Sequence, residues 1–261
     1  MKKLFFVILV LIVSGSLYGQ YRDNIDKKLG GYTFKSFFDT ANYETKFTIL
    51  GANGKKIYEA VYLDFISDVN EHQFEKNGNK YFTVDLYSGG AHCCSALLIC
   101  EIKNNKFKIL DSAFYGNSGY VIEDMDKDGV KEILSGNDMF AYAFTNYAET
   151  RFPLRVQEFK NGKLNEITGR FKADLLAEVG YFEADLEEFL KENPDYVCPD
   201  TEDEDTFNTD AGSMKIMLAA IVADYYSLGE VERGYELVNK YYKCVDKDKF
   251  VKTLKTDFNL K

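Results

Sequence analysis

The chain of 261 residues has no tryptophan, only two histidines and, beyond its first twenty residues, no long hydrophobic run. Without a second apolar stretch of about 18 residues, we expect no membrane span in the mature chain. The scarcity of histidine leaves no Ser–His–Asp set that can be singled out, and no phosphate-binding glycine loop is present. The aromatic residues that do occur, 19 Tyr and 21 Phe, suit a packed β core and argue against disorder.

Residues 1–19 have the organisation of a signal peptide. Lys2 and Lys3 precede an apolar run over residues 4–13, and small residues follow before Gln20. The run is short for a bilayer span, although an uncleaved anchor is the alternative. No cysteine lies near the expected cleavage point, which argues against lipid attachment there. The sequence therefore predicts an exported protein, periplasmic or extracellular.

The chain is acidic, with a formal net charge of −10. Loss of Lys2 and Lys3 with the signal peptide would change this to −12, since two positive charges leave. A strongly acidic surface repels phosphate backbones and anionic lipid, so we expect no nucleic-acid partner. The same surface favours the binding of cations.

Residues 30–169 have the pattern of an antiparallel β domain. Turn signals such as Asn53-Gly54 separate short alternating segments. The expected strands cover residues 32–38, 46–50, 56–61, 81–87, 94–102, 106–114, 120–123, 130–134, 154–159 and 164–168. Residues 20–29 are expected to be loosely ordered, and residues 62–76 are ambiguous.

A weak internal repeat of about fifty residues runs through this domain. Residues 78–83 followed by 102–107 parallel residues 129–134 followed by 159–164. Repeats of short strands at such a period are typical of propeller blades. Two units are too few to close a ring, so the expected architecture is a partial propeller or a sandwich made of blade-like hairpins.

From about residue 170 the periodicity becomes helical, and residues 170–261 are expected to form a C-terminal helical region. An apolar face at Phe182 to Leu190 ends before Asn193-Pro194. Two further stripes, at residues 214–225 and 231–242, flank Leu228-Gly229 and predict an αα-hairpin. The fold class is therefore α+β, with an N-terminal β domain and a helical tail. The two helices are expected to pack on the β domain; the alternative is that their stripes are exposed and form a partner-docking groove.

Nine residues, Asp124 to Glu132, contain the most specific motif. Carboxylates stand at positions one, three, five and nine, and glycine stands at position six. Ca²⁺ takes six to eight oxygen ligands and needs a tight turn to gather them. The predicted ligands are Asp124, Asp126, Asp128, the Val130 carbonyl and Glu132. An EF-hand would need Glu at position twelve, which is Ser135, and helical flanks, whereas these flanks have the pattern of strands.

This motif resembles the calcium loop of the FG-GAP (VCBS-type) blade repeat, D-x-D-x-D-G-x-x-[DE], which lies between strands. The resemblance extends over roughly residues 77–168, and only the loop is specific. It implies one structural calcium site, because the first repeat unit lacks the acidic ligands. It also implies a role in recognition or adhesion, with an unknown protein or glycan as the partner. The alternative is an acidic turn without metal.

Five cysteines in an exported chain favour disulfides with one cysteine left over. Cys198 and Cys244 are expected to pair. Among Cys93, Cys94 and Cys100, a ring between the adjacent cysteines and a bond from either to Cys100 both stay open.

A second candidate site is the stretch Ser88 to Cys94, which contains Gly89-Gly90 and His92 beside Cys93. It is similar to a stretch in uncharacterised exported bacterial proteins, which implies no activity. A Cys–His pair would suit a hydrolase or redox enzyme. Adjacent residues of a strand point to opposite faces, however, and an oxidising compartment disfavours a free thiol. We expect a glycine-kinked loop tied by a disulfide, and a zinc or copper site here is short of ligands. His72 is expected to face solvent.

The sequence therefore favours an exported, calcium-binding structural or recognition protein that is not an enzyme. A hydrolase or redox enzyme using His92 with Cys93 or Cys94 is the alternative.

Overall fold

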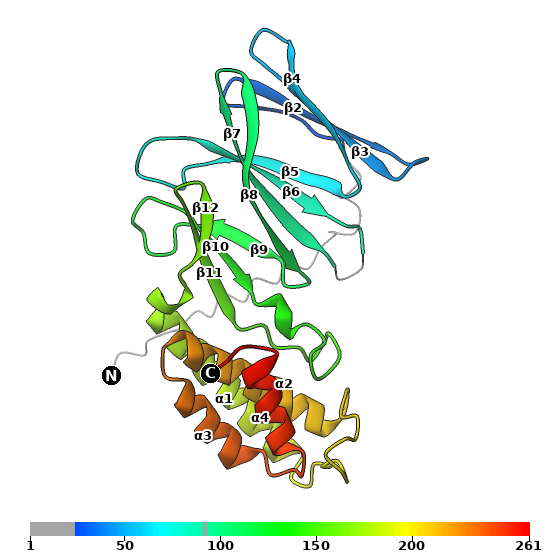
Figure 1. Cartoon of the computed structure of the whole chain (residues 1–261), viewed down its shortest axis with the longest axis vertical. Coiled ribbons are helices and arrows are strands. Elements are labelled where there is room, and N and C mark those ends of the chain that lie inside the picture. Colours follow the sequence, from blue (N-terminus) through cyan, green and yellow to red (C-terminus); the bar gives the residue numbers. More distant parts are fainter. Residues whose placement is uncertain (1–23, 91–92) are drawn as a thin grey trace, which may run out of the picture.

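The computed structural model describes residues 24–90 and 93–261; the predicted signal peptide, residues 1–19, and His92 lie outside this part. Within it, twelve strands form three antiparallel sheets and four α-helices follow (Figure 1). This is the expected α+β architecture. The three sheets lie one after another along the long axis of the molecule, and the helices lie at the far end.

Each sheet is a four-stranded meander in which neighbours in sequence pair with one another. The first contains β1 (Asp26–Leu29), β2 (Tyr32–Asp39), β3 (Glu44–Leu50) and β4 (Lys56–Tyr62). The second contains β5 (Phe65–His72), β6 (Tyr81–Tyr87), β7 (Ser95–Lys103) and β8 (Lys106–Gly116). The third contains β9 (Tyr120–Glu123), β10 (Glu132–Gly136), β11 (Leu154–Lys160) and β12 (Lys163–Glu166).

The second sheet is buried on both faces because the other two sheets cover it. Successive residues of a strand point to opposite faces. One face packs on the first sheet. In the core between them, Val84 and Cys100 of the second sheet and Phe34 and Phe47 of the first sheet are fully buried. The other face packs on the third sheet, and its fully buried members include Leu97, Ile99, Ile133 and Phe159. Apolar residues at consecutive positions of β7 thus reflect two cores.

The sequence repeat matches equivalent strands of the second and third sheets. Residues 78–83 lead into β6 and residues 129–134 lead into β10, the second strand of each sheet. The turns at Asn104-Asn105 and Asn161-Gly162 close the equivalent hairpins β7–β8 and β11–β12, and Asn104, Asn105, Asn161 and Gly162 all have positive φ. The repeat is therefore structural.

The sequence predicts three of the four strands of the first sheet, and β1 is the strand that it does not predict. Residues 26–29 form β1, so the prediction that residues 20–29 are loosely ordered is wrong in this part. The polar strand pairs with β2 from Asp26↔Lys35 to Leu29↔Tyr32. Lys27 donates to Asp68 at 2.9 Å and to Asn70 at 3.0 Å, both on β5. Cross-strand and inter-sheet partners, which the local sequence does not reveal, hold this strand in place.

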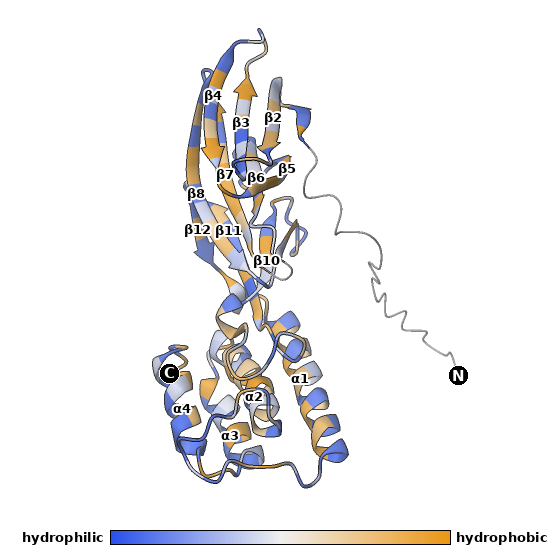
Figure 2. Cartoon of the chain, turned by 90° about the vertical axis from the view of Figure 1, so that its right-hand side faces the viewer, coloured by the Kyte–Doolittle hydropathy of each residue, from blue (hydrophilic) through white to orange (hydrophobic). Residues whose placement is uncertain are grey.

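The helical region begins at Lys172, after the 3₁₀ turn Thr168–Arg170. It contains α1 (Lys172–Glu192), α2 (Asp210–Ser227), α3 (Val231–Tyr241) and α4 (Lys247–Thr256). The predicted end of the first helix before Asn193-Pro194 and the αα-hairpin around Leu228-Gly229 are both confirmed. Figure 2 shows that α2 is the most apolar helix and lies among the others.

The alternative of an exposed docking groove on the predicted stripes is wrong. The six apolar positions of the first stripe are buried: Met214, Met217, Leu218, Ile221, Val222 and Tyr225. They join a core that also contains Tyr235, Val238 and Tyr242 of the second stripe and, in the part of the chain that the structure describes, no residue of a strand. The expectation that the two helices pack on the β domain is therefore also wrong as regards its sheets. Among the described residues, none of the helices is both long and apolar enough to cross a bilayer.

The connection between β10 and β11 ties the third sheet to the helices. It contains a short 3₁₀ helix, η2 (Asp138–Phe140), and places Phe140 and Phe144 in the helical core. There Phe140 packs on Phe258 with ring centroids 4.8 Å apart, and Phe144 packs edge-on against Phe250 at 5.3 Å. Aromatic contacts of this kind supplement the hydrophobic burial.

The cysteines resolve the alternatives left by the sequence. Cys198 and Cys244 form a disulfide, as expected, and close a loop that contains α2 and α3. Cys93 is bonded to its neighbour Cys94. Cys100 is free and fully buried on β7, so the alternative of a bond to Cys100 is wrong. Burial raises the pKa of the Cys100 thiol to about 12, which keeps it protonated.

Asp85 makes the stability of the stacked sheets depend on pH. Burial raises the pKa of Asp85 to about 6, and the Tyr120 hydroxyl, which donates to Asp85 at 2.8 Å across the second and third sheets, opposes this rise. The folded state therefore holds a proton that the unfolded state releases from its ordinary value of 3.8 upwards. The stabilising contribution is complete below about pH 4 and is lost as pH rises through about 6.

We predict that Asp85→Asn removes this step. Relative to the variant, the wild type should lose up to about 3 kcal/mol of unfolding free energy between about pH 4 and pH 6. Urea unfolding over this range measures the difference. Tyr120→Phe is the matched control, because loss of the donor should move the step to higher pH. A constant difference between wild type and Asp85→Asn across the range would contradict the assignment.

Candidate metal centre

The acidic loop joins two neighbouring antiparallel strands, as the sequence predicts. β9 ends at Glu123 and β10 begins at Glu132, and these two residues are register partners. Two residues of the loop have positive φ, Lys127 at 61° and Gly129 at 89°. Glycine adopts this backbone region without strain, which explains its place at position six.

Three aspartates of the loop converge. Asp124, Asp126 and Asp128 each offer a carboxylate oxygen, and these oxygens lie within 4.8 Å of one another. Backbone N–H groups of the loop hold the side chains in place. The Asp128 N–H donates to Asp124 at 2.9 Å and to Asp126 at 3.1 Å, and the Gly129 N–H donates to Asp124 at 2.9 Å. The loop is thus shaped around its own carboxylates.

Glu132, the first residue of β10, is not a member of this group and is only 5% exposed. Its carboxylate accepts the Met125 N–H at 2.9 Å, which closes the base of the loop. Burial raises the pKa of Glu132, and the charges of the three aspartates add to this rise against the Met125 bond. Across the sheet its register partners are Glu123 and Glu158. A nearly buried carboxylate is therefore surrounded by other carboxylates, an arrangement that a bound cation would relieve.

The neighbouring loop brings a positive charge to the site. The β5–β6 loop lies beside the acidic loop, since the Lys131 N–H donates to the Gln73 carbonyl at 3.4 Å. From it the Lys76 ammonium reaches Asp128 at 3.0 Å. Lys76 holds the pKa of Asp128 below its usual range, and the pKa of Lys76 is raised in return. Both side chains are substantially exposed, so this ion pair contributes little stability and leaves Asp128 accessible.

The five predicted ligands are thus placed unequally. Asp124, Asp126 and Asp128 come together, whereas Glu132 stands outside this group and accepts the Met125 N–H with one of its oxygens. Val130 lies in the same loop and donates its N–H to Asp128 at 2.9 Å. The donor set consists of oxygen atoms only, which fits a hard cation such as Ca²⁺. Such an ion would be held by the loop and would cross-link β9 to β10. The three aspartates would provide its negatively charged oxygen ligands.

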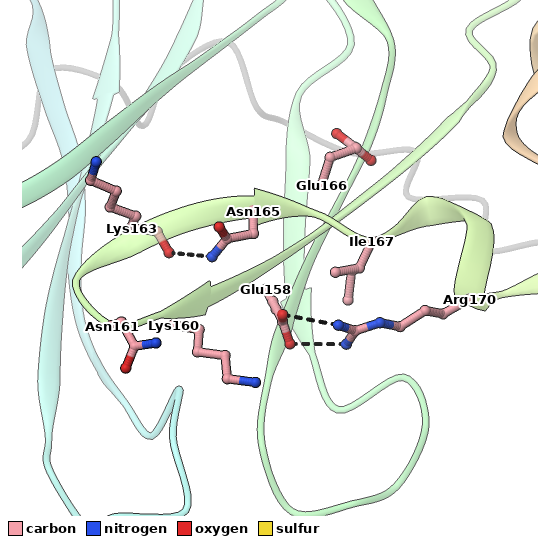
Figure 3. Close-up of a pocket in the computed structure, with 8 residues that line it drawn as sticks. All are labelled: Glu158, Lys160, Asn161, Lys163, Asn165, Glu166, Ile167 and Arg170. Carbon is pink, nitrogen blue, oxygen red and sulfur yellow. Dashed lines mark hydrogen bonds and ion pairs between the residues drawn. The ribbon is translucent and has the colours of Figure 1, made fainter.

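A polar cleft of about 320 Å³ lies on the same sheet, around the β11–β12 turn. Figure 3 shows that two charged residues of this cleft pair with each other, since the Arg170 guanidinium donates to both oxygens of Glu158, at 3.0 and 3.1 Å. Asp126 and Glu132 also raise the pKa of Arg170. Arg170 thus neutralises one of the two carboxylates beside Glu132.

The second predicted site is only partly described, because His92 lies outside the described residues. Cys93 and Cys94 are bonded to each other and so present no thiol. Two hydrogen bonds between Cys94 and Ser88 close the loop. The Cys94 N–H donates to the Ser88 hydroxyl at 2.6 Å, and the Cys94 carbonyl accepts the Ser88 N–H at 3.0 Å. This matches the expected glycine-containing loop with a disulfide.

The prediction that His72 faces solvent is wrong. Both ring nitrogens are buried, and burial lowers the pKa of His72 to about 4, with Lys131 and Lys27 adding to the shift. The ring packs on Phe74 with centroids 5.4 Å apart. The polar neighbours of His72 in sequence gave no sign of this, because the third sheet, not the local segment, covers the end of β5. The same holds for Lys76 and Arg170, whose roles depend on loops brought together by the fold.

Comparison with known proteins gives distant relatives only. No family model matches the chain. A probable thylakoid lumen protein of Synechocystis is 25% identical over 158 residues, which are 60% of this chain and 42% of that protein. An uncharacterized protein of Sinorhizobium fredii is 32% identical over 75 residues, 29% of this chain and 12% of that protein. The chain therefore spans less than half the length of these relatives.

The charge imbalance at Glu132 predicts an unusual mutant. In metal-free protein at pH 7, Glu132→Gln should raise the unfolding free energy by about 0.5–1 kcal/mol, the scale of like-charge pairs across strands. The amide oxygen still accepts the Met125 N–H, while the repulsion disappears. Urea unfolding in excess chelator measures this.

Glu158→Gln is the matched control one strand away. It should lower the stability, because glutamine has one acceptor oxygen in place of two and so loses one hydrogen bond from Arg170 together with the charge of the ion pair. A Glu132→Gln protein less stable than wild type in chelator would contradict the electrostatic account.

Proposed function

We propose that this chain is an exported protein whose three-sheet region binds Ca²⁺ in the β9–β10 loop and serves as a structural or recognition module. The observation that carries the proposal is the convergence of three aspartates in the loop before the nearly buried Glu132. Local negative charge of this density favours the binding of a cation, and oxygen donors in a tight turn favour a hard one. The four-stranded meanders and the strand-flanked loop also suit the resemblance to FG-GAP repeats.

Three observations support export. The chain begins with a charged segment and an apolar run typical of signal peptides. The Cys198–Cys244 disulfide suits an oxidising compartment. One relative carries the description of a probable lumen protein. A non-catalytic role follows from the same site, because a cation at a hairpin tip stiffens the sheet and needs no reactive side chain. An unknown protein or glycan is the partner of the module.

Calcium binding is tested by isothermal titration calorimetry of the mature chain. We expect one site with a dissociation constant on the order of 0.1–1 mM, the range of extracellular calcium modules. Asp126→Asn keeps an acceptor for the Asp128 N–H but loses a charged ligand, so its affinity should fall at least about tenfold. At a calcium concentration of about 100 times the dissociation constant, wild type should gain roughly 2.7 kcal/mol of unfolding free energy.

Asp195→Asn is the control, because Asp195 is an exposed carboxylate in the connection between α1 and α2. It should bind calcium like wild type. Equal binding by wild type and Asp126→Asn would remove the loop as the site, and the absence of any binding would remove the proposed function.

A further inference from the structure

Asp224 is a carboxylic acid enclosed in the helical region. It lies in the last full turn of α2 and is 0% exposed. Neither of its oxygens accepts a hydrogen bond from a conventional donor among the described residues. A buried carboxylate without a donor is strongly disfavoured, and the negative end of the α2 dipole disfavours it further.

The side chain that meets Asp224 is a second carboxyl group, that of Glu178 on α1. Glu178 is half-buried, and its Oε2 accepts the Leu154 N–H of β11 at 2.8 Å. Two acceptors in contact attract each other only if one of them carries a proton. Because the Leu154 N–H stabilises a charge on Glu178, the proton belongs on Asp224.

The charged groups on the surrounding elements do not compensate the pair. In the described part of the chain, Glu178 is the charged group that acts on Asp224. The cations around the pair are bound to other carboxylates: Arg151 to Asp185, Arg155 to Glu166, Arg170 to Glu158, Lys215 to Asp246 and Arg233 to Glu230. A shared proton is therefore the remaining means of neutralising the second charge.

We propose that Asp224 is protonated at neutral pH and donates a hydrogen bond to Glu178, so that one proton fastens α2 to α1 and, through Glu178, to the first residue of β11 in the third sheet. Loss of this proton at alkaline pH places two repelling anions at the junction. This contact is independent of the calcium site. The acidic loop precedes β10, whereas Leu154, which contacts Glu178, pairs with Gly136 at the end of β10.

The pKa shifts of both carboxyl groups agree with a proton on Asp224. Burial, followed by the charge of Glu178, raises the pKa of Asp224 to about 9, and burial also raises the pKa of Glu178. Glu178 lines a cleft of about 530 Å³ between the β9–β10 strands and α1, whereas Asp224 does not line it, so solvent meets the Glu178 side of the pair and the Asp224 side is enclosed. Because the folded state holds a proton that the unfolded state has released above its ordinary value of 3.8, stability falls as pH rises towards 9.

The direct test is infrared spectroscopy of the full mature chain at neutral pH. The carbonyl stretch of a protonated carboxylic acid should be present in wild type and absent in Asp224→Asn. The second measurement is urea unfolding from about pH 6 to pH 10. Relative to Asp224→Asn, the unfolding constant of wild type should rise tenfold per pH unit up to about pH 9 and then level off.

Two further variants keep the test decisive. Glu178→Gln still accepts the Leu154 N–H and can donate its amide to an ionised Asp224, so it should also lose the acid band. Asp174→Asn, an exposed carboxylate in the first turn of α1, should behave like wild type. The proposal is overturned if wild type shows no acid band that Asp224→Asn removes, or if the two proteins have the same pH dependence.

Discussion

The burial of the β5–β8 sheet between two other sheets is the constraint on which the rest of this structure depends. It fixes the alternation of β7, where Leu97 and Cys100 belong to different cores. It also brings the first loops of the second and third sheets side by side, so that Lys76 of one reaches Asp128 of the other. The acidic loop therefore has its shape and its electrostatic surroundings only within the stack.

Within this frame, unpaired negative charge recurs at two depths. At the surface, three aspartates and the nearly buried Glu132 concentrate charge that Lys76 and Arg170 offset only in part. In the interior, Asp224 meets Glu178 without a cation. The two sites differ in solvent access: an exposed loop can take up a metal ion, whereas a sealed helix interface can take up a proton.

The sequence predicted the parts of this fold that have a local pattern. The turn glycines and asparagines, the apolar stripes of α2 and α3 and the acidic loop between strands follow from local patterns, and the Cys198–Cys244 bond follows from the place of both cysteines in the C-terminal part. The polar strand β1 and the buried His72 escaped prediction, because Asp68, Asn70 and the third sheet hold them through contacts distant in sequence. Lys76 and Arg170 were missed for the same reason, and the pairing of Asp224 with Glu178 depends on how α1 packs on α2.

The proposed function depends on a cation that completes the β9–β10 loop. A crystal structure of the mature protein grown with calcium would show whether the ion is there. We expect density for one ion, with oxygens of Asp124, Asp126 and Asp128 at about 2.3–2.6 Å. A well-ordered loop in saturating calcium, with its carboxylates bonded only to backbone N–H groups and to Lys76, would contradict it.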